Sequence, residues 1–202
     1  MKNNRSLILA SKSPRRKYLL EQAGITVAII PADIEEKRFP GESPEEYVKR
    51  LSREKAETIA NQNPGSWVIG ADTIVVINDT ILEKPASNED ARQMLAKLSN
   101  TIHTVFTGYT LCCMECGKTI TCSARTEVLF KHLSAREIEW YIRTGEPFDK
   151  AGAYAIQGLG TFLVRSINGS YTNVVGLPVC EIIELLVSEN IIDMGSEDRH
   201  PL

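Results

Sequence analysis

The densest group of side chains suited to anion chemistry lies in the run from Ser11 to Arg16. Ser13 is a favoured N-cap residue and Pro14 suits the first position of a helix, so a helix is predicted to begin here. The free N–H groups of a first helical turn favour a bound anion. Arg15 and Arg16 oppose the helix dipole at this end, which indicates a negative group nearby. The alternative is a basic turn exposed to solvent.

A second candidate is the carboxylate of Asp72, which is followed by Thr73 and interrupts the apolar run from Trp67 to Ile77. A carboxylate is costly to bury unless it is paired or bound to a metal. Asp72 is therefore predicted either to lie at an exposed bend or to take part in chemistry, by binding Mg²⁺ or by orienting a water molecule. An aspartate that only stabilises a turn is the alternative.

Two lysines are further candidates. Lys84 precedes Pro85, which restricts it to extended backbone from which it could point at a phosphate. Lys55 lies close to the apolar stripe that Val48 and Leu51 form on a predicted helix, so it either extends to solvent or points into a cleft. An exposed lysine remains the alternative at both positions.

The segment from Asp149 to Gly160 is rich in small residues and glycines, which allow a backbone to approach a ligand closely. It matches neither GxGxxG nor a P-loop, so it indicates neither a dinucleotide fold nor a Walker ATPase. The amide of Gln157 is both a donor and an acceptor and can pair with the edge of a base. A further polar loop is predicted at 169–173.

Composition and charge restrict the class of protein. The 202 residues suit a single domain spanning 1–202, and 43% hydrophobic with 24% charged residues fits an ordinary folded chain. A net charge of −3 argues against binding to a nucleic-acid polymer. No run approaches the roughly 20 apolar residues of a membrane helix, and the first ten residues lack a signal-peptide pattern. A cytoplasmic protein without a membrane partner is expected.

The cysteines do not form a recognisable framework. Their number is odd and four of them are bunched, which argues against structural disulfides: Cys112, Cys113, Cys116, Cys122 and Cys180. A zinc site normally needs a second ligand pair beside one CxxC, and the three histidines do not supply it. We interpret the cluster as small apolar residues of a hairpin.

Periodicity and capping signals indicate which elements position these residues. Strands are predicted at 7–10, 25–30, 67–77, 80–82, 101–114, 119–130 and 162–167. Helices are predicted to follow Ser13, Ser43, Ser87 and Ser134, with a last helix at 178–188, a loop at 34–41 and a polar tail from about 193. Strands and helices alternate without a strict βαβ rhythm. The expected fold is α/β or mixed α+β, a twisted mixed sheet flanked by helices, in two lobes around a central cleft. The middle hairpin would form one lobe and the two chain ends the other.

Together these segments resemble the Maf family of nucleotide pyrophosphatases. The matching stretches occur in family order from residue 7 to about residue 187: LASKSPRRKYLL, SREKA, IGADTIVV, ILEKP, GEPFDKAGAYAIQGLG and GSYTNVVGLP. The resemblance implies a metal-dependent hydrolase with a fold akin to that of the inosine triphosphate pyrophosphatases. Such an enzyme attacks the α-phosphate of a nucleoside triphosphate and releases the monophosphate and pyrophosphate.

The resemblance also implies roles for individual residues. Asp72 matches the catalytic acidic residue that accepts a proton from the attacking water. The specificity positions are Arg15, Thr73 and Gln157. The positions that line the phosphate and metal site are Ser13, Arg16, Glu36, Lys55 and Lys84. Asp72 and Glu36 would hold the divalent cation, Mg²⁺ or Mn²⁺, although the Glu35-Glu36 pair leaves a one-residue slip open. A homodimer is implied as well.

Gln157 within DKAGAYAIQG is similar to the family branch that acts on dTTP and UTP. Its amide suits the mixed donor and acceptor edge of uracil or thymine, whereas a carboxylate would suit guanine. The alternatives are the same reaction on 7-methyl-GTP or another non-standard triphosphate, and a nucleotide-binding regulator of septum formation without catalysis. Lys12 falls at a variable position of the motif, and the hairpin cysteines have no assigned role.

Overall fold

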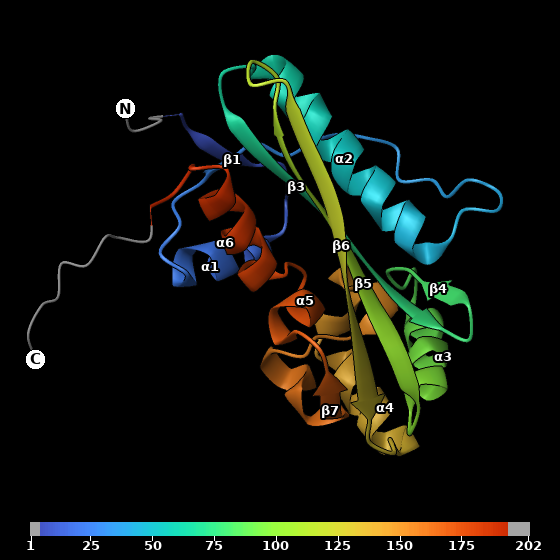
Figure 1. The fold of residues 1–202 in the computed structure, drawn as a ribbon. Helices are drawn as coiled ribbons and strands as arrows, with labels where there is room; N and C mark the ends of the chain where they lie inside the picture. Colours follow the sequence, from blue (N-terminus) through green and yellow to red (C-terminus); the bar gives the residue numbers. More distant parts are fainter. Residues whose placement is uncertain (1–4, 194–202) are drawn as a thin grey trace, which may run out of the picture.

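The structure is a computed structural model that describes residues 5–193. A seven-stranded mixed sheet has the order β2-β1-β3-β5-β6-β7, and β4 pairs with β3 outside this path (Figure 1). β1 is parallel to β2 and β3, and the other pairs are antiparallel. The strands are β1 (Leu7–Leu9), β2 (Ala28–Ile29), β3 (Trp67–Ile77), β4 (Thr80–Leu82), β5 (Ile102–Cys113), β6 (Lys118–Phe130) and β7 (Val164–Asn168). The predicted mixed sheet flanked by helices is confirmed.

Six α-helices and three 3₁₀ helices surround this sheet within residues 5–193. They are α1 (Pro14–Gln22), α2 (Pro44–Gln62), α3 (Asn88–Leu98), α4 (Ala135–Arg143), α5 (Tyr171–Val175), α6 (Val179–Ser188), η1 (Glu146–Asp149), η2 (Ala151–Ala153) and η3 (Gly158–Leu163). None of the helices in this range is long and apolar enough to cross a membrane. The predicted starts are confirmed by the caps, since the side chains of Ser13, Ser43, Ser87 and Ser134 each accept a backbone N–H of the following helix.

Alternation along β3 assigns its side chains to the two faces of the sheet. Val68, Ile74 and Val76 contribute to apolar clusters with α2. Trp67 and Val75, at odd positions, belong to the clusters on the other face, which include residues of α1, α3, α4 and α6. Consecutive residues of this strand therefore reach opposite faces of the sheet.

The edge of β3 that faces away from β5 is unpaired over a short stretch. The two strands on that side, β1 and β4, pair only with the two ends of β3. β1 pairs with residues 67–69 and β4 with residues 75–77. Between them, residues 70–74 have a strand partner only on the β5 side. This gap in the sheet lets side chains from both faces reach one space.

The structure differs from the sequence-based prediction in three places. β2 is confined to Ala28–Ile29 instead of 25–30, and the loop predicted at 169–173 contains the short helix α5, which Ser170 caps. The interpretation that the middle hairpin forms one lobe is wrong. β5 and β6 run the length of the molecule (Figure 1), and β5 supplies Val105 to one main cluster and Leu111 to the other. The predicted polar tail lies beyond Asp193, outside the described residues.

Candidate functional site

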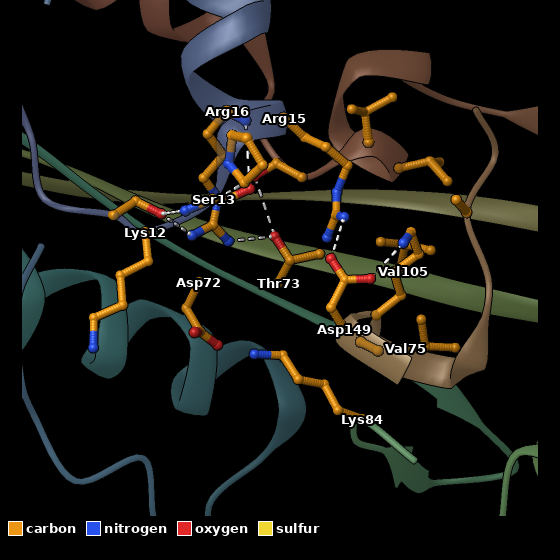
Figure 2. Close-up of a pocket in the computed structure, with 18 of the residues that line it drawn as sticks. Lys12, Ser13, Arg15, Arg16, Asp72, Thr73, Val75, Lys84, Val105 and Asp149 are labelled. Carbon is orange, nitrogen blue, oxygen red and sulfur yellow. Dashed lines mark hydrogen bonds and ion pairs between the residues drawn. The ribbon is translucent and has the colours of Figure 1, made fainter. Parts of the chain in front are cut away.

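A cavity of about 560 Å³ opens at the gap in the edge of β3 (Figure 2). Its walls come from the β1–α1 junction, the segment 32–36, α2, β3, Lys84 shortly after β4, the segment 149–157 and the end of α5. All nine residues predicted to form the site line it: Ser13, Arg15, Arg16, Glu36, Lys55, Asp72, Thr73, Lys84 and Gln157.

Two glycines allow α2 to lie directly against the sheet beside this cavity. A Cβ atom on Gly70 would lie 2.1 Å from the carbonyl oxygen of Ser52 and 2.7 Å from the backbone nitrogen of Ala56. A Cβ atom on Gly108 of β5 would lie 2.1 Å from the carbonyl oxygen of Val48. Only residues without a side chain fit at these contacts, which bring the α2 side chains close to β3.

This close approach places Lys55 against two carboxylates. Its Nζ lies 2.6 Å from Asp72 Oδ1 and 2.6 Å from Glu36 Oε1. Asp72 is 6% exposed and Lys55 is 8% exposed. Asp72 is therefore a buried, paired acid within a continuous strand, and the alternatives of an exposed bend and of a lysine extending to solvent are both wrong. Burial opposes the ionisation of Glu36, but the hydrogen bond and charge of Lys55 outweigh it and lower the pKa of this carboxyl.

On the other face of β3, Arg16 fills the gap between β1 and β4. Its Nε donates to the carbonyl of Gly176, Nη1 donates to Ser11 Oγ and to the carbonyl of Ala71, and Nη2 donates to Thr73 Oγ1, over 2.7–3.1 Å. Figure 2 shows the guanidinium held between the start of α1 and Thr73. Four of its five N–H donors are thus directed at protein acceptors. Arg16 contributes charge and shapes the cavity, with little donor capacity left for a ligand.

Thr73 is held in the same network. Its hydroxyl is hydrogen-bonded to the hydroxyl of Thr107 at 2.9 Å and donates to the carbonyl of Gly176 at 3.2 Å. Alternation along β3 thus gives Asp72 and Thr73 different partners: Asp72 contacts α2, and Thr73 contacts α1 and the end of α5. Both nevertheless line the cavity, because the strand edge between them is unpaired.

The remaining basic residues differ in how far they are already paired. Arg15 Nη1 lies 3.0 Å from Asp149 Oδ2, and Lys150 also pairs with Asp149. Within residues 5–193, the ammonium groups of Lys12 and Lys84 make no hydrogen bond or ion pair. Figure 2 shows both side chains extending into the space beside Asp72. They are the lysines of this cavity that are free to meet an incoming anion.

The loop that carries Gln157 is organised by one carboxylate. Glu146 Oε1 accepts from the hydroxyl of Tyr141 at 2.7 Å and from the backbone N–H of Gly160 at 2.9 Å. Its Oε2 accepts from the N–H of Leu159 at 3.0 Å. Burial opposes the ionisation of Glu146, but these hydrogen bonds lower its pKa. Gln157 directly precedes the segment fixed in this way.

The side chains that line the cavity carry a net positive charge. Six basic side chains, of Lys12, Arg15, Arg16, Lys55, Lys84 and Lys150, face four acidic ones, of Asp33, Glu36, Asp72 and Asp149. The first turn of α1, where Ser13 forms the cap, opens onto the same space. A cavity with two excess positive charges and a helix N-terminus is suited to a polyanion of small size.

The two carboxylates that contact Lys55 are the candidate metal ligands of this cavity. No group of three or more His, Cys, Asp or Glu side chains within residues 5–193 is placed to hold a metal ion by itself. Glu36 and Asp72 converge on the same lysine nitrogen at 2.6 Å each, so their oxygens lie no more than twice that distance apart. Mg²⁺ commonly binds to one or two carboxylates together with phosphate oxygens and water. This donor set therefore fits a cation that binds together with a phosphorylated ligand.

Four of the charged residues that line the cavity are not among the predicted site residues: Lys12, Asp33, Asp149 and Lys150. Lys12 was set aside as a variable position, and neither Asp149 nor Lys150 was singled out within its glycine-rich segment. The positions of Asp149 and Lys150 follow from the 3₁₀ turns η1 and η2, which contact α3, α4 and β3, and no periodic pattern signals such turns. Lys12 stands between two other residues of the motif, and this position could have indicated that it belongs to the site.

This chain is similar to several known proteins. A protein named dTTP/UTP pyrophosphatase from Geobacter sp. (strain M21) is 50% identical over 186 residues, which cover 92% of this chain and 96% of that protein. One of the same name from Syntrophus aciditrophicus (strain SB) is 48% identical over 190 residues, 94% of this chain and 90% of that protein. The solved structure of the Staphylococcus aureus Ham1 protein is similar with a TM-score of 0.48 and 16% identity, over 79% of this chain and 80% of the other. The family model described as Maf-like protein matches residues 6–189, and the chain belongs to the Maf family.

Proposed function

We propose that this protein is a hydrolase that cuts nucleoside triphosphates, in particular dTTP and UTP, into the monophosphate and pyrophosphate. The observation that carries the proposal is the buried Asp72, held by Lys55 at 2.6 Å in a positively charged cavity. The names of the two bacterial relatives support the same reaction and the same substrates. The substrate is a small molecule, and neither a nucleic-acid polymer nor a membrane is part of the proposal.

The triphosphate is assigned to the basic side of the cavity. Lys12 and Lys84 have free ammonium groups and bind phosphate oxygens, and the first turn of α1 offers backbone N–H groups at Ser13. A triphosphate that carries one divalent cation retains about two negative charges at neutral pH. This charge matches the excess of two positive charges among the lining side chains. Arg16 keeps the cavity in shape through its bonds to the protein.

The divalent cation of the proposal is Mg²⁺, with Mn²⁺ as the other candidate. Asp72 and Glu36 would hold it together with phosphate oxygens, because both carboxylates line the cavity and each lies 2.6 Å from the same Lys55 nitrogen, which keeps them close to each other. When bound, the cation would neutralise charge on the phosphate oxygens.

Asp72 is assigned as the base that accepts a proton from the attacking water. The hydrogen bond from Lys55 Nζ fixes the orientation of this carboxylate. The α-phosphorus is the target, and the released pyrophosphate carries charge that Lys12 and Lys84 compensate. Arg15, Thr73 and Gln157 also line the cavity and are assigned to sugar and base recognition. The amide of Gln157 pairs with the donor and acceptor edge of thymine or uracil.

The test is pyrophosphate release with Mg²⁺ from dTTP, UTP, CTP, GTP, 7-methyl-GTP, ITP and ATP. We expect release mainly from dTTP and UTP, and a loss of at least a thousandfold in kcat for Asp72→Asn, on the order of what a general base contributes. Asp79→Asn is the matched control, since Asp79 is exposed in the β3–β4 turn at φ 59°, a conformation that asparagine tolerates.

Each outcome separates one part of the proposal from the others. Near-normal turnover by Asp72→Asn, with an unchanged melting temperature, would refute the role of Asp72. Preference for 7-methyl-GTP or ITP would refute the role of Gln157 but keep the reaction. Tight binding of dTTP without pyrophosphate release from any substrate would refute the hydrolase and support a nucleotide-binding regulator.

A further inference from the structure

Two cysteines at the tip of the β5–β6 hairpin lie in direct contact, away from the cavity. Cys113 is the last residue of β5 and pairs with Lys118, and Cys116 lies in the turn between them. Their Sγ atoms are 2.7 Å apart. Neither residue lines the cavity, and the proposed reaction uses neither of them.

The surroundings of the pair fix the turn in place. The backbone N–H of Glu115 donates to the carbonyl of Pro64 at 3.0 Å, which ties the turn to the α2–β3 connection. Arg5 Nη1 lies 3.0 Å from Glu115 Oε2 and 3.6 Å from Cys113 Sγ. Cys113 is buried, whereas Cys116 is half-buried and reachable from solvent. The two sulfurs therefore need only a small side-chain rotation to reach the bond length of a disulfide, about 2.05 Å.

We propose that Cys113 and Cys116 are a modification site, a dithiol that converts reversibly to a disulfide by exchange with a low-molecular-weight disulfide. The Cys116 thiolate attacks one sulfur of the external disulfide, whose S–S bond breaks and releases the first thiol. Cys113 then attacks Cys116 Sγ and expels the second thiol. The two cysteines lose two electrons and two protons in all, and the external disulfide takes them up as two thiols.

The positions of Cys113 and Cys116 indicate which thiol attacks first and which one resolves. Cys116 is the attacking residue because it is the accessible member of the pair. Cys113 is the resolving residue, and the Arg5 guanidinium at 3.6 Å compensates the charge on its sulfur as it attacks. The hydrogen bond with Cys113 raises the pKa of Cys116, so exchange becomes faster as the pH is raised above neutral.

The three other cysteines do not compete for this bond. Cys122 pairs with Tyr109 in the β5–β6 ladder, four residues along β5 from Cys113. Cys112 points to the opposite face of β5, where it belongs to the cluster under α2. Cys180 is exposed on α6 and has Glu184 as its neighbour. A closed zinc site needs four ligands, and within residues 5–193 no third His, Cys, Asp or Glu joins the pair to form one. The contact between two sulfurs thus favours a disulfide over a bound metal.

The test is mass spectrometry of the full, reduced chain after incubation with oxidised glutathione at mildly alkaline pH. We expect the pair to lose two hydrogen atoms and to retain no glutathione. Cleavage after Glu115, which lies between the two cysteines, should leave two peptides joined by the new bond. In Cys113→Ser the resolving thiol is absent, so Cys116 should keep one glutathione. Cys180 is the internal control, because it should keep glutathione in every variant.

Thermal unfolding gives an independent readout. Oxidation should raise the melting temperature of the wild type by a few degrees, since it closes a loop in the unfolded chain, and it should leave Cys116→Ser unchanged. Stable glutathione on Cys116 of the wild type, or a Cys116 that stays reduced while Cys180 reacts, would overturn the proposal. Because both readouts are independent of pyrophosphate release, this result is separate from the outcome for the proposed hydrolase.

Discussion

Gly70→Ala tests whether the close contact between α2 and β3 creates the site. A Cβ atom at residue 70 would lie 2.1 Å from the carbonyl oxygen of Ser52 and 2.9 Å from Ala56 Cβ. Contacts of a Cβ atom below 3.0 Å essentially do not occur in proteins, and the nearest of these atoms belong to the helix backbone. Helix and strand must therefore separate by at least about 0.9 Å at this point.

The displacement falls on the pair formed by Lys55 and Asp72, which the proposed reaction uses. Ser52 and Ala56 flank Lys55 on α2, and Gly70 shares a face of β3 with Asp72, two residues away. Overpacking a close-packed contact costs about 3 kcal/mol when backbone has to move, which lowers the melting temperature of a domain of this size by roughly 6–12 °C. If this pair acts as proposed, a shift of nearly 1 Å in its geometry should lower kcat/KM on the order of a hundredfold.

The assay combines calorimetry with pyrophosphate release from dTTP, measured well below the melting temperature of the variant so that unfolding does not enter. Gly65→Ala is the matched control, because its Cβ atom would first meet the Glu115 side chain at 3.4 Å. Gly65→Ala should behave like the wild type in both measurements. A Gly70→Ala protein with wild-type melting temperature and kcat/KM would refute the reasoning, since the contact would then not position Lys55.

Three further predictions concern residues around the site and the core. Lys12→Gln should raise KM for dTTP about fivefold with little change in kcat, the effect of one exposed charge contact of about 1 kcal/mol, while Lys17→Gln on the far side of α1 should not. Glu146→Gln should lower the preference for dTTP over CTP roughly tenfold, because an amide cannot accept all three hydrogen bonds that fix the loop after Gln157. Burial lowers the pKa of His103 to about 4 in the folded protein, against about 6.5 in the unfolded chain. The folded protein therefore holds this imidazole neutral, and its free energy of unfolding is at its full value above pH 6.5. About 3 kcal/mol of that free energy is lost as the pH falls toward 4.

The controls for these predictions are direct. Equal KM effects of Lys12→Gln and Lys17→Gln would mean that Lys12 does not contact phosphate. Unchanged base preference in Glu146→Gln would separate Glu146 from specificity. For His103, urea unfolding of the wild type and His103→Gln is compared between pH 6.5 and 4. A difference in unfolding free energy that stays constant with pH would contradict the assignment.

The sequence by itself determined the elements and most of the site. Serine caps and prolines fixed where α1 and α2 begin, because capping depends on residues within one helical turn. The apolar run from Trp67 to Ile77, whose second half is rich in β-branched residues, indicated β3 although Asp72 interrupts it. The family motifs gave nine site residues, and all nine line one cavity.

Only the tertiary structure decided what each of these residues does there. The unpaired edge of β3 depends on where β1 and β4 end, and no local pattern encodes that. The sequence treats Arg15 and Arg16 alike, yet Arg16 is engaged by acceptors from β3, the β1–α1 junction and the residue after α5. Lys12 falls at a variable position of the family motif, so the sequence assigns it no role, yet it lines the cavity with a free ammonium group. Hydrogen-bond saturation and strand pairing are properties of distant chain segments brought into contact, so they emerge only when the chain is folded.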